Sequence, residues 1–188
     1  MIKTIRKEEM KTVGWSGGTT TEIMILPQDS SYKERTFDVR ISSATVDVAK
    51  SDFTKLDGVH RTLMVLDGKM ALYTDDKLLA DLSPLEKNEF EGSDNIRCLG
   101  QGRDFNLMLR NGYKGSVTGF KVNAKEVIEK VAAKCGDVIF VHKGEVELSD
   151  IKDGINIDKG NAAFIESDKY SIKAQEESVF VIVELNGF

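Results

Sequence analysis

Apolar and polar residues alternate in short runs along most of the chain, which is the pattern of β-strands with one buried face. Glycine, aspartate and asparagine separate these runs, and 16 glycines are available to form the tight turns between them. The pattern therefore predicts an all-β protein. The strand-like runs are residues 20–26, 37–46, 61–66, 70–73, 105–109, 138–141, 145–148 and 179–185.

One segment departs from this alternation. Asn123 followed by Glu126 is typical of a helix cap, and the apolar residues after it, from Val127 to Val131, include positions at helical spacing. We therefore expect a short helix over residues 123–133, between two halves of the chain.

The strand pattern occurs twice. Residues 63–68 (LMVLDG) and 139–144 (IFVHKG) each end in a glycine turn, and these two turns are 76 residues apart. Residues 90–94 and 164–168 repeat an aromatic residue before an acidic turn. Paired strands, a glycine turn and a return strand are typical of one cupin-like barrel, although hairpins of any all-β chain can resemble each other by chance. The repeat predicts a bicupin: two jelly-roll barrels, residues 1–112 with a ligand pocket and residues 113–188 with a mainly structural role.

The composition narrows the class of protein. The chain has 188 residues and a formal net charge of -5, without a basic patch, which argues against a nucleic-acid partner. Neither a signal-peptide core nor a run of about 20 apolar residues is present, so we expect a cytoplasmic protein without a membrane partner. Cys98 and Cys135 lie far apart in the sequence and form no CxxC pattern, which favours reduced thiols.

The first cluster of candidate functional residues is a glycine-rich turn. Gly17 and Gly18 follow Trp15, and adjacent glycines let a backbone approach a ligand closely or offer free amide groups to an anion. A plain turn before the strand at residues 20–26 is the alternative.

The second cluster lies on a strand. Arg40 and Ser42 share one face of the run at residues 37–46, because side chains alternate along a strand. A buried arginine needs a carboxylate, which a ligand or the protein itself can supply. The pattern indicates either a carboxylate site, an internal ion pair or an exposed edge.

Two further clusters complete the set. His60 and Arg61 precede an apolar strand, at the place where a metal-dependent cupin carries several histidines. The chain has only two histidines in all, so we expect no metal site. We expect no other cofactor either. Asp104, Asn106 and Met108 share one strand face, and the two polar side chains among them need hydrogen-bond partners such as Arg40 or Arg61.

Taken in order, these clusters resemble the HutD/Ves family, a bicupin family of the RmlC-like cupin superfamily. The resemblance implies two cupin barrels without the cupin metal site, and an association of some members with histidine utilisation and of others with stress. It also implies a pocket for small carboxylates such as formate, lined here by Arg40, Ser42, Arg61, Asp104 and Asn106. The motifs that carry the resemblance are Trp15-x-Gly17-Gly18-x-Thr20-x-Glu22, Arg40-Ile-Ser42-x-Ala44-x-Val46, Phe53-x-x-Leu56-x-Gly58-Val59-x-Arg61 and Asp104-Phe-Asn106-x-Met108.

Three functions remain open from the sequence. The leading hypothesis is a metal-independent binding protein, a sensor or regulator that holds a small carboxylate against Arg40, with Ser42 and Asn106 as donors. The alternatives are a metal-independent isomerase or hydrolase that uses Asp104 or His60 as general base, and a structural or partner-binding barrel. By analogy with other cupins, exposed strand edges favour a homodimer.

Overall fold

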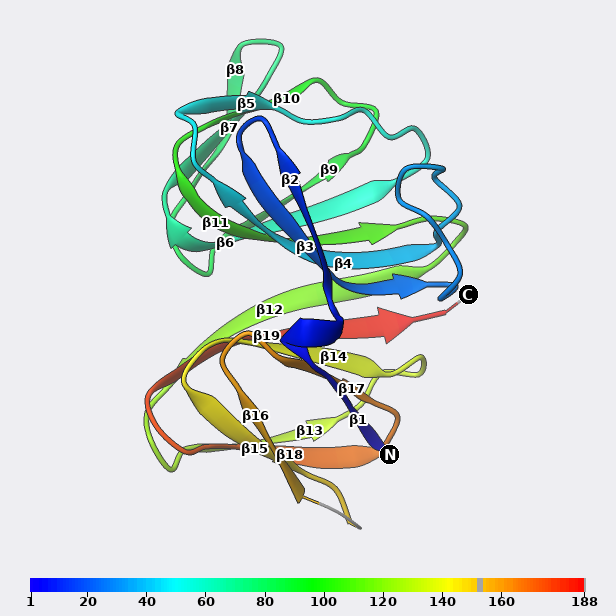
Figure 1. Cartoon of the computed structure of the whole chain (residues 1–188), viewed down its shortest axis with the longest axis vertical. Helices are drawn as coiled ribbons and strands as arrows, with labels where there is room; N and C mark the ends of the chain where they lie inside the picture. Colours follow the sequence, from blue (N-terminus) through cyan, green and yellow to red (C-terminus); the bar gives the residue numbers. More distant parts are fainter. Residues whose placement is uncertain (152–153, 188) are drawn as a thin grey trace. The chain divides into compact units, whose positions relative to one another are not determined.

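The computed structural model describes residues 1–151 and 154–187, and these residues form antiparallel β-sheets almost throughout (Figure 1). The helical residues among them are a single turn of 3-10 helix, Lys7–Glu9. The prediction of an all-β fold is confirmed. No helix in the described part of the chain is long and apolar enough to cross a membrane.

The chain divides into two compact units, each described here by itself. The first unit is Met10–Tyr113, and the second unit combines Met1–Glu9 with Lys114–Phe188. The sequence-based division at residue 112 places the first nine residues in the N-terminal barrel. In the structure they group with the second unit, because β1 (Ile2–Ile5) pairs with β17 (Ala162–Ile165).

The first unit contains two sheets. The six-stranded sheet has the order β2-β3-β4-β11-β6-β9, and the four-stranded sheet has the order β5-β10-β7-β8. Apolar side chains of both sheets, including Leu63 and Leu72, pack into one buried core. The strands are β2 (Lys11–Trp15), β3 (Gly18–Leu26), β4 (Val39–Val46), β5 (Lys50–Asp52), β6 (His60–Gly68), β7 (Met70–Thr74), β8 (Lys77–Leu82), β9 (Lys87–Glu91), β10 (Ile96–Leu99) and β11 (Gly102–Leu109).

The second unit is built in the same way. Its sheets have the orders β1-β17-β14-β19-β12 and β13-β18-β15-β16, and both contribute to a core around Tyr170 and Phe180. Strand pairing among the described residues leaves two separate sheets in each unit, so barrel closure stays a prediction. The remaining strands are β12 (Lys114–Val122), β13 (Val127–Val131), β14 (Asp137–Lys143), β15 (Glu145–Ser149), β16 (Gly154–Asp158), β18 (Lys169–Ala174) and β19 (Ser178–Asn186).

The strand orders bear out the internal repeat. β4-β11-β6-β9 in the first unit corresponds to β12-β19-β14-β17 in the second, and β5-β10-β7-β8 corresponds to β13-β18-β15-β16. Each unit adds strands at a different edge. The first continues beyond β4 with the β3–β2 hairpin, drawn in blue in Figure 1, whereas the second adds β1 beside β17.

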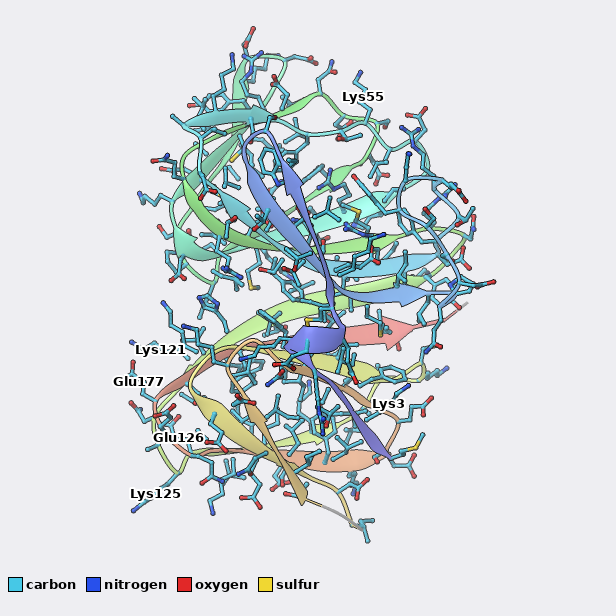
Figure 2. All side chains as sticks on the ribbon, in the orientation of Figure 1. Lys3, Lys55, Lys121, Lys125, Glu126 and Glu177 are labelled. Carbon is cyan, nitrogen blue, oxygen red and sulfur yellow. The ribbon has the colours of Figure 1, made fainter. Side chains whose placement is uncertain are left out.

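The predicted helix at residues 123–133 is wrong. The Asn123 side chain does contact Glu126, with Nδ2 donating to Oε1 at 2.7 Å, but this contact closes a turn. Lys125 in this turn has a φ of 70°, which is left-handed and does not start a helix; its side chain extends away from the ribbon in Figure 2. The β-branched residues that follow form strand β13, in which Val127 and Val131 share an exposed face.

Candidate functional site

The candidate site lies on one face of three neighbouring strands at the centre of the six-stranded sheet of the first unit. Side chains at alternate positions of β4 and β11 share this face, and the register sets Ser42 opposite Asn106 and Ala44 opposite Asp104. Strand β6 adds Arg61, which is paired with Met108 of β11. These side chains line a cavity with a volume of about 600 Å³.

Arg40 is buried in this cavity wall and already has a carboxylate partner. Its Nε donates to Glu22 Oε2 at 2.7 Å, and its Nη1 donates to Ser42 Oγ at 3.1 Å. The ring of Tyr32 lies 4.1 Å from the guanidinium carbon, within the range of a cation–π contact. Arg40 is therefore held by an internal ion pair, one of the alternatives that the sequence left open.

Arg61 is equally buried, with 6% of its surface exposed, but its partners are different. Its Nη2 donates to Asn106 Oδ1 at 2.9 Å, while its Nε has no hydrogen-bond partner. Within residues 1–151 and 154–187, no carboxylate forms an ion pair with it. The rings of Phe53 and Phe90 lie 4.9 and 5.1 Å from its guanidinium carbon. Burial lowers the pKa of Arg61 to about 10, so the side chain remains a cation at neutral pH.

Asp104 is a buried acidic residue of the cavity lining, and it connects to Arg61 through Asn106. Asn106 Nδ2 donates to Asp104 Oδ1 at 2.8 Å, which leaves Asn106 Oδ1 free to accept from Arg61. Burial raises the pKa of Asp104 to about 6, and the nearby charge of Arg61 and the hydrogen bond from Asn106 limit that rise. Arg61, Asn106 and Asp104 thus form a hydrogen-bonded chain that ends in a carboxyl group with a raised pKa.

Two buried polar atoms of the cavity lining lack protein partners. They are Arg61 Nε and Ser51 Oγ, two of three such side-chain atoms found in the described residues. Buried polar groups almost always have hydrogen-bond partners, and unpaired ones gathered at a cavity indicate a place for a guest molecule.

The β2–β3 hairpin forms a further part of the wall. Lys11, Val13 and Trp15 alternate along β2 and all three line the cavity. A side chain at position 17 would meet the Trp15 ring, with Cβ only 2.2 Å from Cζ3, and one at position 18 would meet the backbone of Thr45. Gly17 and Gly18 thus allow close packing at the turn, and neither lines the cavity.

His60 lies outside the cavity lining. It occupies the first position of β6, and its Nδ1 is 2.9 Å from Glu91 Oε1, with Glu89 on its other side. Since Arg61 faces the cavity, strand alternation alone places its neighbour His60 on the opposite face. Among the described residues, no group of three His, Cys, Asp or Glu side chains is placed to hold a metal ion.

The cavity lining contains more basic than acidic residues. Four basic residues stand against three acidic ones, and Asp52 among the acids pairs with Arg97, whose Nε lies 3.2 Å away. The chain as a whole has a net charge of -5, so the cavity is a locally positive site in an acidic protein. The basic residues are Lys11, Lys33, Arg40 and Arg61, and the acidic ones are Glu22, Asp52 and Asp104.

A family model named HutD matches residues 7–182, which is nearly the whole chain. The chain belongs to the HutD family. Among solved structures, the conserved protein of unknown function PA5104 from Pseudomonas aeruginosa PAO1 superposes with a TM-score of 0.85 at 22% identity, covering 100% of both chains. HutD from Pseudomonas fluorescens SBW25, solved in a formate condition, gives 0.73 at 20% identity over 100% of both chains.

The wider fold is that of the cupins. A cupin 2 conserved barrel domain protein from Leptotrichia buccalis superposes with a TM-score of 0.58 at 12% identity, covering 97% of this chain and 96% of that one. No protein with a curated description matched the sequence. At these identities the structural likeness establishes the fold, while the family follows from the sequence match.

Several cavity residues were absent from the sequence-based set. Glu22 stood in the family motif, but its contact with Arg40 depends on the pairing of β3 with β4, which sets Glu22 opposite Ser42 and diagonal to Arg40. The sequence did not single out Lys11 and Val13 as cavity residues. All residues of β2 are exposed, so the strand has no alternation of buried and exposed positions that would mark one face. Phe53 and Tyr32 come from connecting segments, whose positions sequence periodicity does not predict.

Proposed function

We propose that the cavity of the first unit binds a small organic carboxylate, with Arg61 as its cationic anchor. The observation that supports this most strongly is a buried arginine that has one neutral hydrogen-bond partner, no ion pair within the described residues and an unpaired Nε. A charge in such a position is costly unless a counter-ion joins it. A carboxylate satisfies a guanidinium with two parallel hydrogen bonds.

The anchor differs from the one that the sequence favoured. Arg40 was the expected anchor, but Glu22 occupies its Nε and Ser42 its Nη1. Arg40 instead adds positive charge beside Arg61, and Ser51 contributes an unpaired hydroxyl to the same cavity. Both features favour an anionic guest with more than one polar contact.

The arrangement suits a sensor or regulator more than a catalyst. Among the described residues, no serine or threonine hydroxyl of the cavity lining hydrogen-bonds to a carboxylate or a histidine, and binding alone requires only the charges and donors described above. The family resemblance links such a role to histidine utilisation. The fluorescens relative, solved in a formate condition, is consistent with a carboxylate guest in this family.

The test is calorimetric titration of the protein with formate, urocanate and N-formylglutamate. We expect at least one of these acids to bind, and Arg61→Met to weaken that binding by roughly 30-fold or more, because a buried charge contact is lost. Arg6→Met is the matched control, since it removes an exposed arginine that is not part of the cavity lining. Absence of binding by every carboxylate tried, or equal binding by Arg61→Met, would refute the proposal.

One observation supports a second candidate, a metal-independent enzyme. Asp104 lines the cavity with a pKa raised to about 6, which is the range in which a carboxyl group can exchange protons with a bound substrate. His60, the other base considered, lies outside the cavity lining. Turnover of a bound acid that disappears in Asp104→Asn, with binding retained, would favour the enzyme over the sensor.

A further inference from the structure

Two exposed apolar side chains lie at the cavity. Val13 is 53% exposed and Trp15 is 40% exposed, and both line the cavity from strand β2 at the edge of the sheet. Exposed apolar side chains gathered at a concave site contact the apolar part of a ligand in many proteins. Here they share one strand face with Lys11, so β2 presents apolar groups and a cation to the same space.

The Trp15 ring is built into the wall. Position 17 is glycine, and any side chain there would have its Cβ 2.2 Å from Trp15 Cζ3 and 2.8 Å from Val48 Cγ2. The chain therefore leaves position 17 empty so that the indole can lie against the turn. An indole that lies against the turn and is 40% exposed offers an apolar surface to a guest.

Other residues of the cavity lining also provide apolar surface close to the cation of Arg61. Phe53, Val46 and Met108 add apolar surface to the cavity, and Phe53 also lies beside the Arg61 guanidinium. A volume of about 600 Å³ falls in the range that binds a multi-atom organic molecule, and a one-carbon acid fills only a small part of it. The lining thus combines one cationic anchor with extensive apolar surface.

From these observations we infer that the ligand is an organic acid with an apolar body, whose carboxylate lies at Arg61 and whose body contacts Val13 and Trp15. This inference rests on the proposed carboxylate site and adds its specificity: Val13 and Trp15 select for the length and apolar character of the acid. Each methylene group that the cavity buries strengthens binding roughly three- to fourfold.

The experiment is a titration with acetate, butyrate and hexanoate, with 1-hexanol as the uncharged counterpart of the longest acid. Trp15 is the one tryptophan of the chain, so its fluorescence reports on this wall directly. We expect affinity to rise along the series, a blue shift of the emission with hexanoate that acetate does not cause, and much weaker binding of 1-hexanol.

Variants separate this inference from the proposal beneath it. Val13→Thr should weaken hexanoate binding several-fold more than acetate binding, because it replaces a methyl group of the wall by a hydroxyl. Val127→Thr is the matched control, an equally exposed valine on the edge strand β13, and should change neither.

Acids that bind with the same affinity whatever their length, without a change in Trp15 emission, would overturn the inference and leave the carboxylate site standing. Binding of none of the acids would overturn both. Binding of 1-hexanol as tight as that of hexanoate would show that the apolar wall acts without the Arg61 anchor, and would also overturn the inference.

Discussion

The two units share one strand order but fill their interiors differently. In the first unit, Ala44 of β4 stands opposite Asp104 of β11; in the second, the corresponding strands pair Phe120 of β12 with Phe180 of β19. The two phenylalanine rings stack with their centroids 5.2 Å apart. The comparison shows that a small and a charged residue at these positions leave a cavity, whereas two aromatic rings occupy the same part of the sheet in the second unit.

A second pair of matched positions carries charge in both units. Arg61 of β6 stands opposite Met108 of β11, and Asp137 of β14 stands opposite Glu184 of β19. Because β6 corresponds to β14 and β11 to β19, Arg61 and Asp137 occupy equivalent positions in the two units. Asp137 is fully buried and accepts hydrogen bonds from Tyr170 Oη at 2.6 Å and from the Ala133 amide at 3.0 Å. The acidic group of the second unit thus has its hydrogen-bond donors within the protein, while the Nε of Arg61 in the first unit has no hydrogen-bond partner among the described residues.

The largest difference between the two units should appear in the free energy of unfolding when Asp137 or Arg61 is replaced. We expect Asp137→Ala to lower the free energy of unfolding by about 3 kcal/mol, because Tyr170 and Ala133 lose their buried acceptor. Arg61→Met should change it by less than about 1 kcal/mol or raise it, since an unpaired buried charge is replaced by an apolar side chain. Urea unfolding of both variants measures this, and similar losses would contradict the assignment of different roles.

The second prediction, of intermediate size, is that Asp104 in the first unit makes the stability of the protein depend on pH. The pKa of Asp104 is raised from 3.8 to about 6, so between roughly pH 4 and pH 6 the folded protein keeps a proton that the unfolded chain has lost. Stability contributed by this group is therefore present at low pH and falls as the pH rises through that window.

Asp104→Asn removes this dependence and should stabilise the protein above pH 6, by on the order of 2 kcal/mol relative to its effect at pH 4. Unfolding midpoints measured across this range test the prediction. Asp81→Asn, at an exposed aspartate of the same unit, is the control. A difference from the wild type that does not change with pH would show that Asp104 titrates normally.

The smallest expected effect is a change in ligand affinity when the cavity of the first unit is partly filled. Ala44→Phe copies into the first unit the residue that stands at the corresponding position of the second, and the ring should enter the existing cavity. We expect carboxylate affinity to fall at least tenfold, about 1.4 kcal/mol, with little change in the unfolding midpoint. Titration combined with thermal unfolding checks both parts, and unchanged affinity would show that the ligand does not approach β4.

The strand arrangement and much of the cavity face followed from the amino-acid pattern. Alternation placed Arg40 and Ser42 on one face of β4, and Asp104, Asn106 and Met108 on one face of β11, because side-chain direction along a strand has a period of two residues. The repeat was visible because both copies need the same turns. The expected helix failed because the capping pair Asn123 and Glu126 also suits a turn between strands.

The chain's sequence by itself therefore determined the all-β fold, the duplicated order of strands and the polar residues that share a face. Only the tertiary structure decided which arginine has a carboxylate partner, since the contact of Glu22 with Arg40 depends on how β3 pairs with β4. It likewise decided that Val13 borders the cavity, beside Trp15, which the sequence had already placed in a candidate cluster. Contacts between distant segments depend on how strands pair and bend, and a linear pattern of apolar and polar residues does not encode those distances.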